Sequence, residues 1–426
     1  MQTQATPHVR HNFVYNVFDG GFYGFGLYAA SYQTVLPLFL ATLTDSPLLI
    51  GLVGSLHFLG WQLPQMLTVG HVSRLTRYKR FVLLMTLHER LPYFGLLLVA
   101  LLIPQLSREL ALGLAFAMIL WQSFGAGVTA TGWQSMVAKI MPNAIRGTFY
   151  GMQSALAQGM GALGAIIAGL LIERLDSPWD YAACFAVASV GMWLSFAFLA
   201  QTREPAHEVE IVQRPGLRDV LRAAKSILAR DVNFRWFALV RILGQTALMA
   251  QGFFAIFAVQ RFGIADELIA GVMTTIMLVS QALGNPVLGW LGDRFGHRYA
   301  VLIGVVAAVG SALSVWMATG VSSFYLAFAL GGIANAALWT TVLAMTPEFG
   351  SLSERPYYIA LSSTLVAPAS LLAPVIGGWL AESVSYEATF ALAAIGGALA
   401  LLVVAVFLRD PVPRRRPAAT AAVAGD

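Results

Sequence analysis

Residues 110–137 read LALGLAFAMILWQSFGAGVTATGWQSMV and contain no ionisable side chain. A helix of this length rises about 1.5 Å per residue and exceeds the roughly 30 Å hydrocarbon thickness of a bilayer. Residues 301–319 form a second block without an ionisable side chain. Across the 426 residues only 11% are charged, against about 25% in an average soluble domain. These features predict an integral membrane protein.

Apolar blocks recur along the chain and predict twelve transmembrane helices, because each block is long enough to cross the hydrocarbon layer. The expected spans are 13–42, 47–68, 81–104, 110–137, 147–172, 180–200, 233–262, 266–290, 298–319, 323–346, 357–382 and 386–408. The blocks do not alternate polar and apolar residues as the strands of a transmembrane barrel do. The expected fold class is therefore an all-α integral membrane protein.

Short matches between the two halves of the chain indicate an internal repeat. Gly70 and Lys79 follow span two with the same spacing at which Gly289 and Arg298 follow span eight. Such a repeat predicts two six-helix bundles related by an axis along the membrane normal. The expected organisation is an N-terminal half at 1–200, a cytoplasmic linker at 201–232, a C-terminal half at 233–408 and a cytoplasmic tail at 409–426.

The basic residues are distributed unevenly between the two sides of the predicted membrane topology. Only Arg108, Arg174 and Arg261 fall in the connections on one side, whereas most other Lys and Arg fall in the tails, the linker and the alternate connections. This asymmetry predicts cytoplasmic N- and C-termini in the cell membrane. Because the net charge of +5 lies in short segments between apolar blocks, nucleic acid is not expected as a partner.

Within the linker, apolar residues recur at helical spacing. They are Leu217, Val220, Leu221, Ala224 and Leu228, and the basic residues of the same segment fall on other faces. This pattern predicts an amphipathic helix on the cytoplasmic membrane surface. A regulatory or partner-binding helix is the alternative interpretation.

The segment between spans eight and nine reads GWLGDRFGHR, residues 289–298. It resembles the loop signature of the major facilitator superfamily, Gly-x-Leu-Ala-Asp-Arg-x-Gly-Arg-Arg, with Gly292 in place of Ala and His297 in place of a basic residue. The resemblance extends over residues 13–408 and implies that spans one, four, seven and ten surround a central cavity. The candidate gating residues are Gly289, Asp293, Arg294, Gly296 and Arg298.

A carboxylate in this loop has a plausible physical role. It can accept hydrogen bonds at the N-terminus of a neighbouring helix, where the helix dipole is positive. The resemblance implies that span eleven begins nearby, just after Arg355, so Asp293 is expected to close the cytoplasmic side against that helix. The alternative is a basic loop that only supplies turn residues. The equivalent first-half loop has Arg74 at the acidic position, so its contact is missing or built differently.

Four charged residues fall inside the predicted spans and are candidates for coupling: Asp19, Glu89, Arg90 and Arg241. An ionisable group in hydrocarbon is costly, so each must face protein or water. Asp19 is a candidate proton or substrate-cation site, or else a solvated carboxylate near the interface. Arg241 is expected to bind an anionic group, to pair with Asp19, or to reach the cytoplasmic interface. Glu89 and Arg90 are expected to brace spans two and three by ion pairs rather than to couple transport.

Uncharged polar and aromatic residues mark the spans that the resemblance places around the cavity. They are Tyr23, Tyr28, Gln122, Thr129, Gln245, Gln251, Asn335 and Trp339. Such a lining suits a moderately apolar organic solute with a few hydrogen-bonding groups. The alternative is that these side chains form hydrogen bonds between helices.

The sequence carries no sign of an enzyme, a metal site or a cofactor. It contains no phosphate-binding Gly-x-x-x-x-Gly-Lys loop, so direct ATP coupling is not expected. It also lacks a His and Cys cluster of the kind that binds metal. The single cysteine, Cys184, cannot form an intramolecular disulfide.

The expected function is secondary active transport of a small organic solute by alternating access, with proton-coupled efflux by antiport. The expected partners are a small-molecule substrate, the lipid bilayer and protons, and a monomer is expected. Two features differ from drug/proton antiporters, because span four has no arginine and span five has no Gly-Pro pair. The alternatives are an uptake symporter or facilitator for a nutrient and, in another class, a non-transporting receptor or scaffold.

Overall fold

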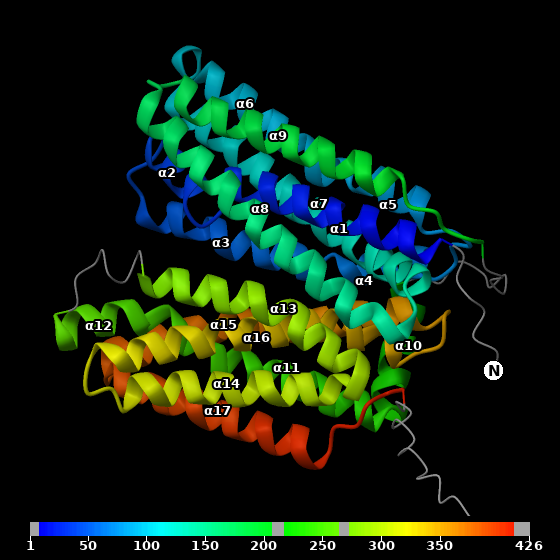
Figure 1. The fold of residues 1–426 in the computed structure, drawn as a ribbon. Helices are drawn as coiled ribbons and strands as arrows, with labels where there is room; N and C mark the ends of the chain where they lie inside the picture. Colours follow the sequence, from blue (N-terminus) through cyan, green and yellow to red (C-terminus); the bar gives the residue numbers. More distant parts are fainter. Residues whose placement is uncertain (1–7, 207–216, 264–271, 413–426) are drawn as a thin grey trace, which may run out of the picture.

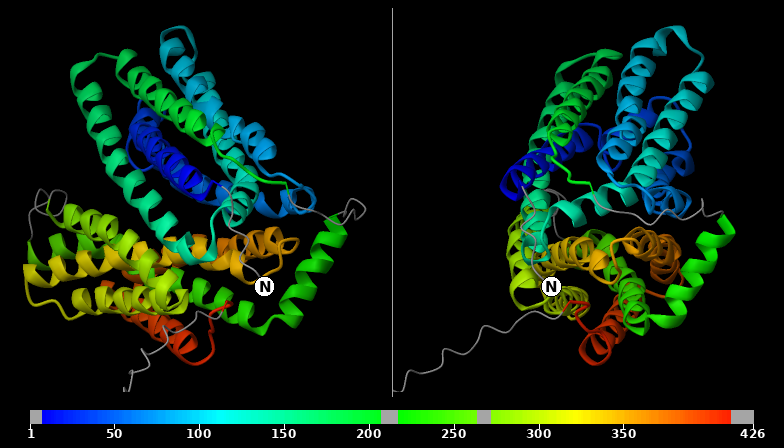
Figure 2. Two further views of the ribbon diagram at one scale, coloured as in Figure 1. Left: turned by 45° about the vertical axis from the view of Figure 1, so that its right-hand side comes forward. Right: turned by 90° about the vertical axis from the view of Figure 1, so that its right-hand side faces the viewer.

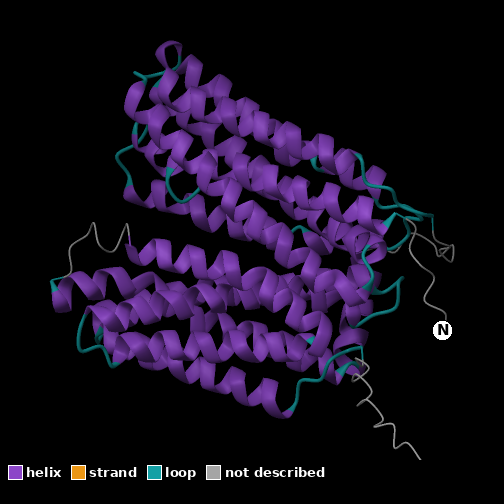
Figure 3. Cartoon of the chain, viewed as in Figure 1, coloured by secondary structure: helices purple, strands orange, loops and turns teal. Residues whose placement is uncertain are grey.

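The computed structural model describes residues 8–206, 217–263 and 272–412 of the chain. Helices joined by short loops make up these described residues, and no strand is found among them (Figure 3). The helices form two bundles, which lie one above the other in Figure 1 and are seen from two further sides in Figure 2. The all-α prediction and the division into two helical bundles are confirmed.

The first bundle contains predicted spans one to six. Its helices are α1 (Val9–Ala29), α2 (Val35–Ala41), α3 (Pro47–Gln62), α4 (Gln65–Val72), α5 (Lys79–Met85), α6 (Leu87–Leu102), α7 (Arg108–Ile140), α8 (Arg146–Arg174) and α9 (Trp179–Ala200). Span one is interrupted at residues 30–34, span two next to Pro64 and span three at Thr86. At the first break the Ser31 hydroxyl accepts a hydrogen bond from the Gln33 amide at 3.1 Å. Such local bonding competes with the helix, and proline lacks the amide hydrogen that a continuous helix uses.

The second bundle contains predicted spans seven to twelve. Its helices are α11 (Val232–Leu248), α12 (Phe254–Phe262), α13 (Thr274–Phe295), α14 (His297–Trp316), α15 (Val321–Met345), α16 (Arg355–Ser383) and α17 (Tyr386–Val406). The 3-10 turn η3 (Met249–Phe253) joins α11 to α12 within span seven. Within the described ranges, nine helical stretches are long and apolar enough to cross a membrane by length and composition. Spans one and two are divided into shorter helices. Their continuous apolar composition therefore predicts longer unbroken helices than the structure contains.

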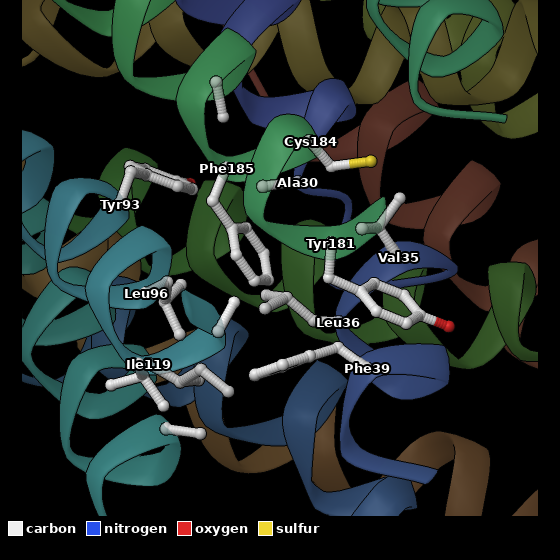
Figure 4. Close-up of a cluster of buried hydrophobic side chains, with 14 of the residues drawn as sticks. Ala30, Val35, Leu36, Phe39, Tyr93, Leu96, Ile119, Tyr181, Cys184 and Phe185 are labelled. Atoms are coloured by element: carbon white, nitrogen blue, oxygen red, sulfur yellow. The ribbon is translucent and has the colours of Figure 1, made fainter. Parts of the chain in front are cut away.

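Each bundle has its own hydrophobic core. In the first bundle, Phe39 of α2, Leu96 of α6 and Phe185 of α9 are buried in one cluster, which Figure 4 shows. In the second bundle, Phe257 of α12 and Phe390 of α17 belong to a separate buried cluster. Small residues allow close helix packing in a membrane, where lipid and side chains are equally apolar. Two separate cores fit two halves that can move relative to each other.

The two bundles touch at the end of the molecule that carries residue 8 and the linker helix α10 (Leu217–Arg230), called here the terminal end. A Cβ added to Gly147 of α8 would lie 2.4 Å from the Gly289 carbonyl oxygen of α13, so the two backbones are in direct contact. Gly151 likewise lies against Asn285. A Cβ on Gly159, farther along α8, would meet nothing within 4 Å. Figure 1 shows the bundles farther apart toward the opposite end.

The linker contains the predicted amphipathic helix, α10 (Leu217–Arg230). Its apolar face packs on protein, because Val220 is buried in a cluster with Val69 of α4 and Ala360 of α16. Leu221 remains 54% exposed. The helix therefore contacts both bundles at the terminal end, and the predicted membrane-surface face is largely covered by protein.

Candidate functional site

Asp293, in the last turn of α13, reaches the other half of the molecule. Its carboxylate oxygens accept hydrogen bonds from the backbone amides of Gly147 and Thr148, at 2.8 and 2.6 Å. These amides lie in the first turn of α8, where free N–H groups and the helix dipole favour a negative charge. A helix N-terminus was predicted as the partner, but span eleven was the wrong helix. The backbone contact between Gly147 and Gly289 brings α8 to this position instead.

Three further buried ionisable groups surround this contact. His297 Nε2 lies 3.8 Å from Asp293 Oδ1 and 3.7 Å from Glu348 Oε1. Arg146 Nη1, from the first half, lies 4.0 Å from the same Glu348 oxygen. Despite this gathering of acids and a histidine, the described residues contain no group of three that could hold a metal ion. The sequence interpretation missed Arg146 and Glu348, because each looks like an ordinary charged residue in a loop just outside a predicted span.

Gly289 also meets the first half, at Gly147, whereas Arg298, Arg294 and Gly296 contact neighbours in their own half. Arg298 donates hydrogen bonds to the carbonyl oxygens of Val404 and Ala405 in α17. Arg294 is exposed, and its guanidinium carbon lies 5.6 Å from the centre of the Trp290 ring. Gly296 has φ +115°, a conformation that favours glycine, and so allows the turn into α14. Their gating role stays a prediction.

In the first half, two carboxylates share one arginine. Asp19 of α1 lies 3.6 Å from Arg90 of α6, and Glu89 lies 3.6 Å from the same guanidinium. Exposure is 5% for Asp19, 7% for Glu89 and 2% for Arg90. The Ser195 hydroxyl of α9 donates to Asp19 at 2.6 Å and accepts from Arg90 at 2.7 Å. The cluster therefore joins α1, α6 and α9, and carries a formal charge of −1 when both acids are ionised.

The two carboxylates of this cluster differ in their hydrogen bonds. Glu89 accepts from the Tyr23 hydroxyl at 2.5 Å and from the Thr86 hydroxyl at 3.2 Å. Asp19 accepts from Ser195. The ion-pair network expected around Glu89 and Arg90 is present, but it ties span three to spans one and six rather than to span two. Arg90 points toward α9, where it also donates to the Met192 carbonyl.

Arg241 of α11 lies in the second half and is not paired with Asp19. Its guanidinium donates to the backbone carbonyl and the hydroxyl of Ser362 in α16. The Ser362 hydroxyl also lies 3.4 Å from the Thr346 hydroxyl. The pairing of Asp19 with Arg241 that the sequence suggested is therefore wrong, because Asp19 already pairs with Arg90 in its own half.

The first-half cavity candidates lie in different surroundings. Tyr23 belongs to the charge cluster, and Tyr28 packs against Gly161 of α8 while remaining 36% exposed. Gln122 lines a small internal cavity of about 10 Å³, room for about one water molecule. In that cavity the Gln122 amide oxygen lies 3.4 Å from His57 Nδ1. Thr129 bonds back to its own helix.

The second-half cavity candidates form one hydrogen-bonded pair and one contact between halves. Asn335 of α15 donates to the Gln251 side chain at 3.0 Å. Trp339 is 48% exposed, and its ring centre lies 5.5 Å from that of Trp61 in α3. Gln245 is partly exposed on α11. Gln62 follows Trp61 in the chain. Its side-chain amide donates a hydrogen bond across the halves to the Ser370 hydroxyl of α16 at 3.3 Å.

Comparison with protein families assigns the architecture. A model of the Major Facilitator Superfamily matches residues 20–273 and 248–424. The chain belongs to this superfamily. Among solved structures, the proton:xylose symporter XylE has a TM-score of 0.72 at 14% identity, over 95% of this chain and 96% of that one. A bacterial homologue of the iron transporter ferroportin, in an outward-facing state, has a TM-score of 0.71 at 13% identity, over 92% and 98%. These likenesses show the fold alone.

Curated relatives include two resistance proteins and one protein named as an MFS-type transporter. Multidrug resistance protein 1 of Bacillus subtilis is 28% identical over 33% of this chain and 36% of its own length. The Tetracenomycin C resistance and export protein of Streptomyces glaucescens is 28% identical over 34% and 27%. An uncharacterized MFS-type transporter of Methanocaldococcus jannaschii is 25% identical over 87% and 89%. The matches to the first two span about a third of those relatives.

Family and fold together define the class of protein. The chain is a multi-pass membrane protein of the major facilitator superfamily, a family of transporters and not of enzymes. The twelve-helix arrangement predicted from the apolar blocks is confirmed. Proteins of this class bind small-molecule substrates within the membrane.

Proposed function

We propose that this superfamily member exports a small organic solute in exchange for protons, by alternating access between its two halves. The observation that carries the proposal is the buried cluster of Asp19, Glu89 and Arg90. Two acids and one base leave an unbalanced negative charge among residues of a predicted membrane span, where such a charge is costly. Binding one proton neutralises the cluster.

Asp19 is the carboxylate that we expect to carry this proton. Glu89 accepts hydrogen bonds from two hydroxyl groups and lies beside Arg90, so its ionised form is better stabilised. Asp19 has one hydroxyl donor, Ser195, besides Arg90. Asp19 also lies on α1, and the superfamily arrangement puts span one beside the central cavity. Protonation of Asp19 would weaken its attraction to Arg90 and loosen α1 from α6.

Export is favoured over uptake by the named relatives. The first two are a multidrug resistance protein and a resistance and export protein, although each match covers only part of those proteins. Aromatic and amide side chains such as Trp339, Gln245 and Asn335 fit an organic solute with a few hydrogen-bonding groups. An uptake symporter would instead move the solute in the same direction as the protons, and the experiment below distinguishes the two directions.

We expect the terminal end to face the cytoplasm, with the protein a monomer in the cell membrane. The support is the excess of Lys and Arg in the tails and linker. The closed contact at Asp293 would then seal the cytoplasmic side. Reporter fusions at the C-terminus and in the loop at Asp176 test the topology. A reporter that works only in the cytoplasm should be active at the C-terminus, and one that works only outside the cytoplasm should be active at Asp176. Activity of the external reporter at the C-terminus contradicts this orientation.

Proton coupling is tested with purified protein in liposomes, using a solute found by thermal-shift screening of a compound library. An imposed pH gradient should drive the solute against the proton flow in the wild type. Asp19→Asn should abolish this accumulation while leaving solute exchange without a gradient. Asp45→Asn is the matched control, because the Asp45 side chain is 87% exposed and pairs only with surface Arg108. Full gradient-driven transport by Asp19→Asn contradicts the proposal.

A further inference from the structure

Arg241 differs from Arg90 in having no acidic partner. Within the described part of the chain its guanidinium contacts Ser362 through a carbonyl and a hydroxyl, both neutral. Neither partner compensates the positive charge, and no described carboxylate lies within ion-pair distance of it. A cation without a counter-charge is disfavoured inside a membrane protein even when it is only partly buried. An anion supplied from outside the chain would remove this cost.

The position of Arg241 along α11 favours a solute over a lipid headgroup as the source of that anion. Arg241 is nine residues into α11, which begins at Val232. At 1.5 Å per residue this is about 14 Å along the helix, well inside the predicted span 233–262. A headgroup phosphate lies at the edge of the hydrocarbon layer. Transporters of this architecture bind solute near the middle of the membrane, between their halves.

The contacts of Arg241 lead to a helix that meets the other half. Gln245 lies one helical turn farther along α11, so both polar side chains share a face, and both are partly exposed. Ser362 belongs to α16, the helix that contacts α3, α4 and α7 of the first half. The Gln62 amide of α3 donates to Ser370 of the same α16. These contacts put Arg241 next to the inter-half surface rather than toward lipid.

We infer that Arg241 binds the anionic group of the transported solute, and that the solute is a small organic carboxylate. This inference rests on the proposed transport function and names its substrate class. A guanidinium has five N–H donors in a planar fork that matches a carboxylate with two parallel hydrogen bonds. Ser362 uses only part of this fork, and Gln245 supplies a neutral donor one turn away.

The test measures equilibrium binding to the purified full chain by thermal shift. The probes are matched pairs of equal shape: benzoate with benzamide and benzamidinium, and lactate with lactamide. Sodium chloride and sodium phosphate at equal ionic strength are the inorganic controls. The variants are Arg241→Gln and Arg241→Lys, and Arg108→Gln is the control because its side chain is an exposed surface cation, 51% accessible.

At least one carboxylate should raise the unfolding temperature of the wild type, and its amide should not. Arg241→Gln should bind that carboxylate at least about tenfold more weakly, the loss expected for one charge-assisted hydrogen-bonded contact. Arg241→Lys should retain part of the binding and Arg108→Gln all of it.

Four results would overturn the inference. They are no shift with either carboxylate, equal shifts with the amides or benzamidinium, equal shifts with chloride or phosphate, and unchanged carboxylate binding in Arg241→Gln. The binding assay needs no proton gradient. A transporter without proton coupling therefore still passes it, so failure of the proposed coupling and failure of this inference are distinguishable.

Discussion

Arg90 in the first half and Arg241 in the second both lie within predicted membrane spans, away from the ends. Arg90 is 2% exposed and has two carboxylates, two hydroxyls and two backbone carbonyls around it. Arg241 contacts one serine. The first arrangement compensates its cation within the fold, whereas the second has no counter-charge among the described residues.

This difference indicates a division of labour between halves that share one architecture. A cluster with two acids and one base can respond to a proton, because the proton neutralises the excess negative charge of Asp19 and Glu89 over Arg90. An uncompensated cation can respond to an anion. In alternating access the halves must also separate at one end, and at the terminal end Asp293 joins them. The following changes test each element of this comparison.

Arg90→Met should cause the largest loss of stability. It leaves Asp19 and Glu89 buried without their cation, and breaking a buried ion pair in this way typically costs about 3–5 kcal/mol. Thermal unfolding can be followed with a thiol-reactive dye, because Cys184 is the single cysteine and is fully buried. Arg108→Met, at an exposed ion pair, should leave the unfolding temperature unchanged. An equally stable Arg90→Met protein would contradict the view that this arginine balances the first-half charges.

Asp293→Asn should open the terminal end without unfolding the protein. The amide keeps the shape but loses the charge that two α8 amides and the helix dipole stabilise, so the closed state should weaken by about 1.5–3 kcal/mol. The reporter is a single cysteine at Ala344, in a Cys184→Ala background, because Ala344 is fully buried in a cluster with Phe149 of the first half. Its labelling rate should rise about tenfold or more. Unchanged labelling would exclude a gating role for Asp293.

Much of the helical layout could be predicted from the sequence, whereas the pairing of charges could not. Continuous apolar blocks locate spans because hydrocarbon thickness sets a minimum length. The break at residues 30–34 escaped the prediction, because Ser31 and its neighbours look like a short polar interruption of an otherwise apolar block. Apolar composition indicates where a helix crosses the membrane. It carries little information about which face of the helix points toward each neighbouring helix.

The candidate site illustrates this limit. Asp19 and Arg241 were candidates at matching depths, but the partner of Asp19 is Arg90, 71 positions away on another helix and in the same half. Which face of α1 meets α6 depends on helix packing that the sequence pattern does not encode. The same holds for Asp293, whose residue type and role as a hydrogen-bond acceptor followed from the loop motif. Its partner helix depends on the close approach of Gly147 to α13.

Gly147→Ala tests whether backbone contact, rather than charge alone, holds the halves together. The new Cβ would lie 2.4 Å from the Gly289 carbonyl oxygen, so the halves must shift apart. Overpacking of this kind costs about 1–3 kcal/mol. Labelling of the cysteine at Ala344 should therefore increase. Gly159→Ala on the same helix is the control, since its Cβ meets nothing within 4 Å. Equal labelling of both variants would show that the Gly147 contact does not limit opening.

Arg241→Met should have the smallest effect on stability, which is the opposite of the result expected for Arg90→Met. The change removes a cation that has only neutral contacts, and with it the cost of burying that charge. The Ser362 hydroxyl keeps another neighbour, because it also lies 3.4 Å from the Thr346 hydroxyl. Without added solute, the unfolding temperature should rise or fall only slightly, by no more than a loss of about 1 kcal/mol in the free energy of unfolding would produce.

The measurement uses the Cys184 dye assay on wild type, Arg241→Met and Arg90→Met prepared side by side. A large fall in the Arg241→Met unfolding temperature would mean that Ser362 alone makes this arginine a structural residue. It would then be equivalent to Arg90, and the contrast between the halves would fail. A stable Arg241→Met protein that loses the stabilisation by carboxylates would separate the two roles. The cation would then be unnecessary for folding because its counter-charge arrives only with the solute.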